Sequence, residues 1–156
     1  MYKGFVERAI FVASPPSIVL EGIKHFFQER NNTVELSVAL RDVDVPADFQ
    51  ATHPVRVELE SRPNTLLVGR KNDYLALHWS PESGHYPSFD GQIAIRPSSS
   101  QTELIVSGEY TPPLGRLGAA FDQRIGKRLA QATLDRLLHE LKMALEGNYA
   151  TLKSVL

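Results

Sequence analysis

Strict alternation of apolar and polar residues dominates the middle of the chain and constrains its fold more than any other feature. Leu36, Val38 and Leu40, for example, stand at every second position of one run. Because successive side chains of a strand point to opposite faces, such a run predicts a strand with one buried and one solvated face. Four more runs show the same pattern, at 55–60, 74–79, 92–96 and 103–110. Together they predict one antiparallel sheet.

Further strands are expected beside these runs. Residues 5–12 are rich in β-branched and aromatic types and predict a first strand, and residues 66–69 predict a short one. Residues 42–53 are less regular and fit either a loop or a bent edge strand. Turn-forming residues separate the runs, at 63–64, 72–73, 81–84 and 97–100. We therefore expect a sheet of about seven strands.

Two helices are predicted, one short and one long. Ser14 and Pro15 mark the start of the short helix, with Ser14 as its N-cap and Pro15 in its first turn, and it ends near Asn31 and Asn32. The long helix spans about 116–146, where Gly147 is expected to stop it. Its apolar stripe lies on one face over 117–129 and on another over 134–145. A rotating stripe fits a helix that crosses a strongly curved sheet.

Composition narrows the classes of function. The 156 residues have the size of one domain, 1–156, and the formal net charge of −1 argues against a nucleic-acid binder. The absence of cysteine excludes disulfides, thiolate metal sites and cysteine nucleophiles. No apolar run approaches the roughly 20 residues of a membrane span, and charges interrupt the N-terminus where a signal peptide needs an apolar core. We therefore expect a cytoplasmic protein without a membrane span, of open oligomeric state.

The order of the expected elements is strand, short helix, meander and long C-terminal helix. Its most specific segment is residues 102–115, followed by Phe121-Asp122 and Leu129-Ala130, with a Trp at 79 and Pro87-Ser88-Phe89-Asp90-Gly91 upstream. This arrangement resembles the helix-grip fold of the START-like (SRPBCC) superfamily, which includes polyketide cyclases, pollen-allergen-type ligand carriers and lipid-transfer domains, and it looks like a bacterial branch. The resemblance implies an α+β domain whose curved antiparallel sheet wraps a long C-terminal helix, with a cavity between them. It implies no single activity, and no motif permits a residue-by-residue transfer of catalytic roles.

Inward aromatic residues are the main candidates for a binding site. Trp79 and Tyr110 lie in the buried phase of their strands, so each is either a plain core contact or a wall of a cavity. Asp122 lies in a row with Gly118, Gly126 and Ala130 on one side of the long helix and is either structurally paired or directed at a ligand. The predicted ligand-binding set is Trp79, Phe89, Tyr110, Leu117, Phe121, Asp122, Ile125 and Gly126.

Catalytic chemistry has little support in the sequence. The five histidines lack helical metal-ligand spacing, and no activated nucleophile or phosphate-binding loop occurs, so no metal, cofactor or catalytic residue is predicted. The leading hypothesis is non-catalytic binding of a small apolar or amphipathic ligand that resembles a lipid, quinone or polyketide. One alternative is a cyclase or dehydratase that uses Asp122 with His78 or Tyr110 as an acid/base pair. Another is a protein-interaction module.

Overall fold

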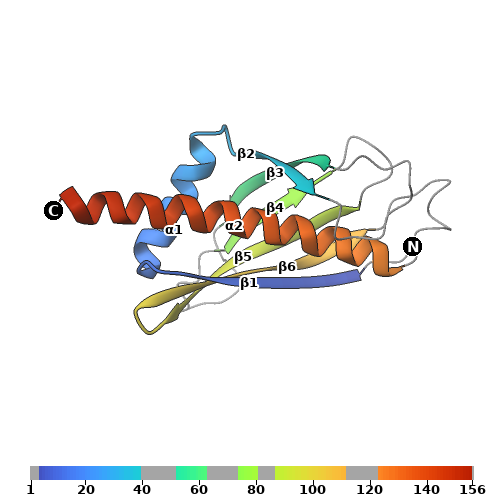
Figure 1. Cartoon of the computed structure of the whole chain (residues 1–156). Coiled ribbons are helices and arrows are strands. Elements are labelled where there is room, and N and C mark those ends of the chain that lie inside the picture. The colour runs from blue at the N-terminus through green and yellow to red at the C-terminus, as the bar shows by residue number, and fades with distance from the viewer. Residues whose placement is uncertain (1–3, 40–51, 63–73, 81–86, 112–122, 156) are drawn as a thin grey trace.

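The computed structural model describes residues 4–39, 52–62, 74–80, 87–111 and 123–155. Strands and helices follow the predicted order, and the structure confirms the α+β helix-grip class (Figure 1). The elements are β1 (Gly4–Val12), α1 (Pro16–Gln28), β2 (Thr33–Ala39), β3 (Thr52–Arg62), β4 (Tyr74–Trp79), β5 (Ser88–Ser98), β6 (Gln101–Thr111) and α2 (Gln123–Val155).

The described strands form one six-stranded antiparallel sheet. Its order is β1-β6-β5-β4-β3-β2, so that the first strand pairs with the last and the others follow as a meander. The predicted strand at 66–69 and most of the irregular segment 42–53 lie outside the described residues, although β3 begins at Thr52. The sheet curls, and α2 runs along one of its faces, called the inner face here (Figure 1).

The start of α1 differs from the prediction. Pro15 occupies the N-cap position, Pro16 is the first helical residue, and no side chain caps the helix. Ser14 is buried and its carbonyl accepts a hydrogen bond from the Thr102 hydroxyl at 2.6 Å, while its own hydroxyl has no partner in the described part of the chain. The prediction of Ser14 as the cap is therefore wrong, because this residue joins the core between β1 and β6.

The end of α2 also differs from the prediction. The helix runs through Gly147 to Val155, so the predicted stop at Gly147 is wrong. Glycine ends a helix where the chain must turn into the left-handed conformation, but Gly147 keeps a helical backbone. A glycine inside a helix costs about 1 kcal/mol relative to alanine, which a long helix tolerates. At the other end, residues 116–122 lie outside the described residues.

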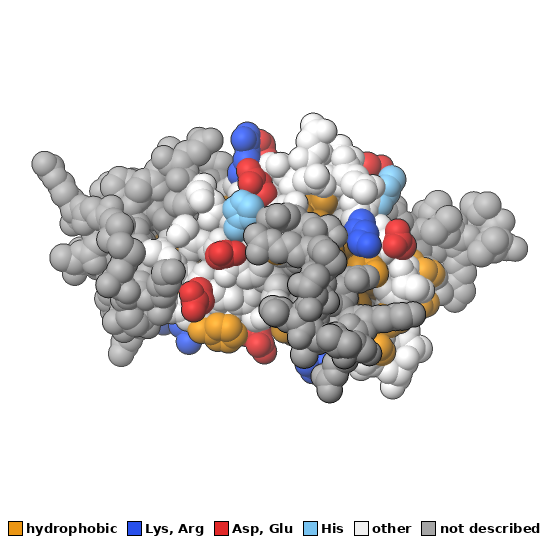
Figure 2. Space-filling model, turned by 180° about the vertical axis from the view of Figure 1, so that it is seen from behind, with side chains coloured by type: hydrophobic (Ala, Val, Ile, Leu, Met, Phe, Trp, Pro, Cys, Tyr) orange, Lys and Arg blue, Asp and Glu red, His pale blue; other side chains and the backbone are white. Residues whose placement is uncertain are grey.

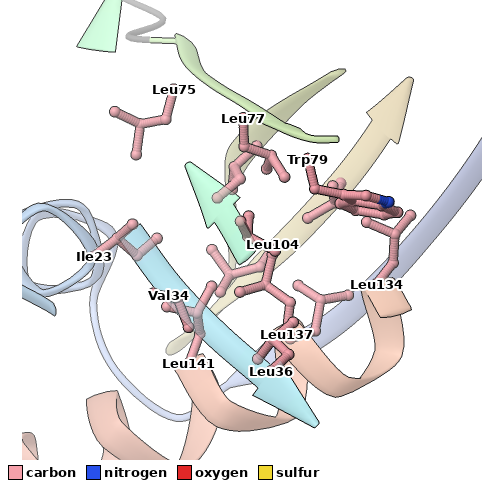
Figure 3. Packing of buried hydrophobic residues seen from close by; sticks show 14 of the residues in the cluster. Ile23, Val34, Leu36, Leu75, Leu77, Trp79, Leu104, Leu134, Leu137 and Leu141 are labelled. Atoms are coloured by element: carbon pink, nitrogen blue, oxygen red, sulfur yellow. The ribbon is translucent and has the colours of Figure 1, made fainter. Parts of the chain in front are cut away.

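A single apolar core lies between α2, α1 and the inner face of the sheet. The strands contribute every second residue, as the alternation predicted, and α2 contributes its leucines (Figure 3). The fully buried side chains include Leu75, Leu77, Ile93, Leu104, Leu129, Leu134, Leu137 and Leu141. Burial of such side chains, at about 25 cal/mol per Å² of apolar surface, is the main force that holds α2 on the sheet.

Candidate ligand-binding site

Three aromatic residues form one lateral row on the inner face. Trp79 of β4 is the register partner of Phe89 of β5, which in turn is the partner of Tyr110 of β6. Their exposed fractions are 1%, 3% and 2%. Because register partners stand about 5 Å apart, the row is a continuous aromatic strip across three strands.

The Trp79 side chain is fixed on both its apolar and its polar side. Its ring stacks on that of Phe89, with 4.5 Å between the centroids and 17° between the planes. Its indole Nε1–H donates to the carbonyl of Pro87 at 2.8 Å in a buried hydrogen bond. Figure 3 shows Trp79 on the same side of the sheet as Leu104 and the α2 residue Leu134. The indole N–H of this inward tryptophan therefore has its hydrogen-bond partner in Pro87, the residue that precedes β5.

Tyr110 lies over the edge of the sheet. Its register partner on β1 is Gly4, and the Tyr110 ring occupies the space that a Cβ atom at Gly4 would need. A glycine at the start of the edge strand thus lets the phenol ring lie flat on the inner face.

A pair of glycines adjoins the aromatic row. Gly91 and Gly108 are register partners, and a Cβ at either would collide with the backbone of the opposite strand, at the Ser107 or the Asp90 carbonyl. The tip of the Phe89 ring lies beside both glycines. Sequence reasoning missed this pair as part of the site, because its signal is the register and not the spacing along the chain.

The other predicted site residues belong to the segment before and within the first turns of α2. Leu117, Phe121 and Asp122 lie outside the described residues, as does Gly118. Ile125 is in α2, but its side chain is not described, whereas Gly126 and Ala130 are both buried on the helix. The structure therefore brings Trp79, Phe89 and Tyr110 together, and the contribution of residues 117–125 stays a prediction.

His78 belongs to the opposite face of the sheet. It alternates with the buried Leu77 and Trp79, and its Nε2 lies 2.9 Å from the Glu58 carboxylate on the outer face. Tyr110 faces inward, so the use of His78 as an acid/base group beside this aromatic row is ruled out by geometry. The alternation at 74–79 already predicted this outward position, because His78 stands between Leu77 and Trp79, which point inward.

The outer face has a polar depression of about 600 Å³ over β4, β5 and β6 (Figure 2). Its lining includes Phe5, which is 60% exposed, and the register partners Asp90 and Glu109. Neither carboxylate has an ion-pair partner among the described residues. Trp79 and Phe89 also line this depression, so it borders the aromatic row from the opposite side of the sheet, where Asp90 and Glu109 point outward.

The described residues include no group of three His, Asp or Glu side chains placed to hold a metal ion. Among the inner-face side chains that the structure describes on the strands, those of Arg8 and Tyr110 are ionisable. His53 of β3 is the register partner of Val38 and shares the inner phase, but its side chain lies outside the described ones. Arg8 is half-exposed and paired with Asp135 of α2, and this hydrogen-bonded pair raises the pKa of Arg8 above its ordinary value. No described helix is long and apolar enough to cross a membrane.

Comparison with known proteins supports the fold. No family model matches the sequence, and no curated protein matches it. Solved structures do match. Ara h 8.0201 is similar over 96% of this chain and 99% of its own, with a TM-score of 0.54 and 10% identity. A START superfamily protein from Mycobacterium smegmatis is similar over 95% of this chain and 98% of its own, with a TM-score of 0.52 and 14% identity. The Zhui aromatase/cyclase from Streptomyces sp. R1128 is similar over 94% of this chain and 93% of its own (0.51, 14%). The chain has the START-like, SRPBCC-type fold.

Proposed function

We propose that this protein binds and carries a small apolar or amphipathic molecule between the inner face of the sheet and α2, without transforming it. The observation that carries this proposal is the buried aromatic row of Trp79, Phe89 and Tyr110. Binding sites for small molecules are typically apolar and aromatic, with few polar groups. The predicted partners of this row are Leu117, Phe121, Asp122, Ile125 and Gly126.

The charges of the described inner face favour carriage over catalysis. General acid–base catalysis needs at least one group that can exchange a proton with the substrate, usually with a second group beside it. Arg8 is bound in its pair with Asp135, and His78 faces outward with Glu58. Tyr110 is the remaining ionisable group among the described inner-face side chains of the strands, and a tyrosine is a weak acid or base near neutral pH. His53 of β3 shares that face by register, and its side chain is not described.

A cyclase-type enzyme is the second candidate, because the Zhui aromatase/cyclase shares the fold. In that case Tyr110 would be the inward group that touches the substrate. Replacement of Tyr110 by Phe separates the two roles. Loss of turnover with retained binding supports an enzyme, whereas an unchanged affinity and no turnover in either protein supports a carrier.

The fluorescence of Trp79, the only tryptophan, provides a binding test. We expect at least one member of a panel of fatty acids, quinones and polyketides to change its intensity or wavelength in a saturable manner, because the indole lies in the proposed site. Gly126→Leu should keep the fold and weaken this binding. Gly147→Leu is the matched control, since it makes the same change in α2 where the structure has open space. A panel without any saturable change argues against the proposal.

The outcome for Gly126→Leu also distinguishes two packing models. If Gly126 borders a cavity, the added side chain occupies the ligand space and the free energy of unfolding changes little. If Gly126 is a packing seam against the sheet, overpacking should cost about 1–3 kcal/mol. A variant with unchanged stability and unchanged binding contradicts both models.

A further inference from the structure

The inner face has a bare patch next to the aromatic row. In the lateral row of Leu77, Gly91, Gly108 and Val6, the two central positions have no side chain. Strands lie about 4.8 Å apart, so this patch is about 10 Å wide. The glycines are required by the close approach of the β5 and β6 backbones, because a Cβ at either would collide with a carbonyl oxygen of the opposite strand.

Phe89 fills this patch. Its Cα belongs to the aromatic row, but its ring reaches over the neighbouring row, and Cζ is the ring atom nearest to the missing Cβ positions of both Gly91 and Gly108. Phe89 is only 3% exposed, so the ring occupies volume that two side chains would occupy elsewhere on the face. One rotatable side chain therefore closes a space two strands wide.

Phe89 is the member of the stacked pair without a polar anchor. Trp79 is held by the hydrogen bond from its Nε1 to Pro87, whereas a phenylalanine ring is held by packing alone and can adopt another staggered χ1 rotamer. A rotation of Phe89 off the glycines would uncover a flat slot. Its floor is the backbone of Gly91 and Gly108, and the Trp79 ring forms one wall.

We propose that Phe89 determines the size and shape of the ligand, because its position decides how far a flat ring system can enter between Trp79 and the glycine pair. This inference rests on the proposed function, since it concerns the same proposed site on the inner face. A flat, apolar slot beside an indole fits a planar ring better than a flexible chain. The ligand class that follows is an amphipathic molecule with a planar ring system at its buried end.

Two probes with the same charged group test this preference: anthracene-2-sulfonate, which is planar, and decane-1-sulfonate, which is a flexible chain. Calorimetric titration compares the unaltered protein with Phe89→Ala. Removal of the ring opens the slot permanently, so we expect Phe89→Ala to bind the anthracene probe about tenfold more tightly and the decane probe with little change. Leu104→Ala is the matched control, because it opens an apolar cavity on the same face away from the glycine pair.

An equal gain for both probes, or an equal gain in Leu104→Ala, overturns the role of Phe89. If the unaltered protein binds neither probe and Phe89→Ala binds anthracene-2-sulfonate, the carrier function loses support while Phe89 still closes the slot. If neither protein binds while circular dichroism shows both to be folded, both proposals fail. Should Phe89→Ala not fold, Phe89→Leu shortens the side chain less severely, and the same comparison of the two probes then decides.

Discussion

Arg8 of β1 and Asp135 of α2 are joined by two parallel hydrogen bonds, Nε to Oδ1 at 2.8 Å and Nη2 to Oδ2 at 2.7 Å. Two further contacts continue along the helix: Lys142 Nζ donates to the Phe11 carbonyl at 2.8 Å, and the Ala13 amide donates to Glu146 at 3.2 Å. Residues 135–146 of α2 are thus fastened to β1 and to Ala13 just after it, and this part of the helix covers part of an edge that would otherwise expose backbone groups.

The Arg8–Asp135 pair should contribute a small coupling energy. Both side chains are close to half-exposed, so a double-mutant cycle with Arg8→Ala and Asp135→Ala should give about 0.2–1 kcal/mol in urea unfolding, and less in high salt. The pair raises the pKa of Arg8 above its ordinary value, so its contribution is fully present throughout the neutral range and is lost only at strongly alkaline pH. We therefore expect no change in coupling between pH 6 and 9 from the titration of Arg8. If the losses of stability in the two single variants are strictly additive, the Arg8–Asp135 pair has no coupling energy and this prediction is wrong.

Trp79→Phe should destabilise the protein through the hydrogen bond more than through lost volume. Phenylalanine can keep the stack on Phe89 but leaves the buried Pro87 carbonyl without its donor. An orphaned buried acceptor costs about 1–3 kcal/mol. Thermal unfolding followed by circular dichroism measures this loss. A variant as stable as the original protein would show that another donor or water replaces the indole.

Gly108→Ala should be destabilising, by about 1–3 kcal/mol, because its Cβ meets the backbone of β5. The Phe89 ring is also near this position, so the double variant Phe89→Ala/Gly108→Ala identifies the cause. The β5 backbone cannot move aside as a side chain can. Removal of the Phe89 ring should therefore not restore the stability that Gly108→Ala loses. Chemical denaturation of the four proteins of this cycle provides the measurement, and full recovery in the double variant would assign the strain to Phe89 instead.

Gly147→Ala should stabilise the protein by about 0.5–1 kcal/mol. The position is helical, exposed and surrounded by open space, so alanine adds helix propensity without a collision. The midpoint of urea unfolding should rise. The opposite sign would indicate that α2 ends at Gly147 in a left-handed conformation, as the sequence suggested.

Much of the fold follows from local periodicity. The alternation at 74–79 and 103–110 predicted which side chains of β4 and β6 are buried, and Trp79 and Tyr110 face inward accordingly. Features that depend on register or on tertiary contact could not be predicted in this way. The pairing of Gly91 with Gly108 arises only when β5 and β6 align, and Ser14 is drawn into the core by Thr102 from a distant strand.

The end of α2 shows a different limit of sequence reasoning. Gly147 is a common helix stop, but the residues around it decide whether the chain turns there. Glu146, the residue before Gly147, forms an ion pair with Lys142 and accepts a hydrogen bond from the amide of Ala13, just after β1, so the helix is held against the sheet edge up to this point. These contacts keep the helix regular up to Gly147, and they cannot be seen in the local pattern.

Native mass spectrometry of the protein purified from its own host tests directly whether the protein carries a small molecule. We expect a second species that is heavier than the polypeptide by the mass of one small molecule and that loses this mass on denaturation. Gly126→Leu should reduce this species, and Gly147→Leu should retain it. A spectrum with the bare polypeptide alone, together with no response of Trp79 fluorescence to fatty acids, quinones or polyketides, would contradict the carrier function.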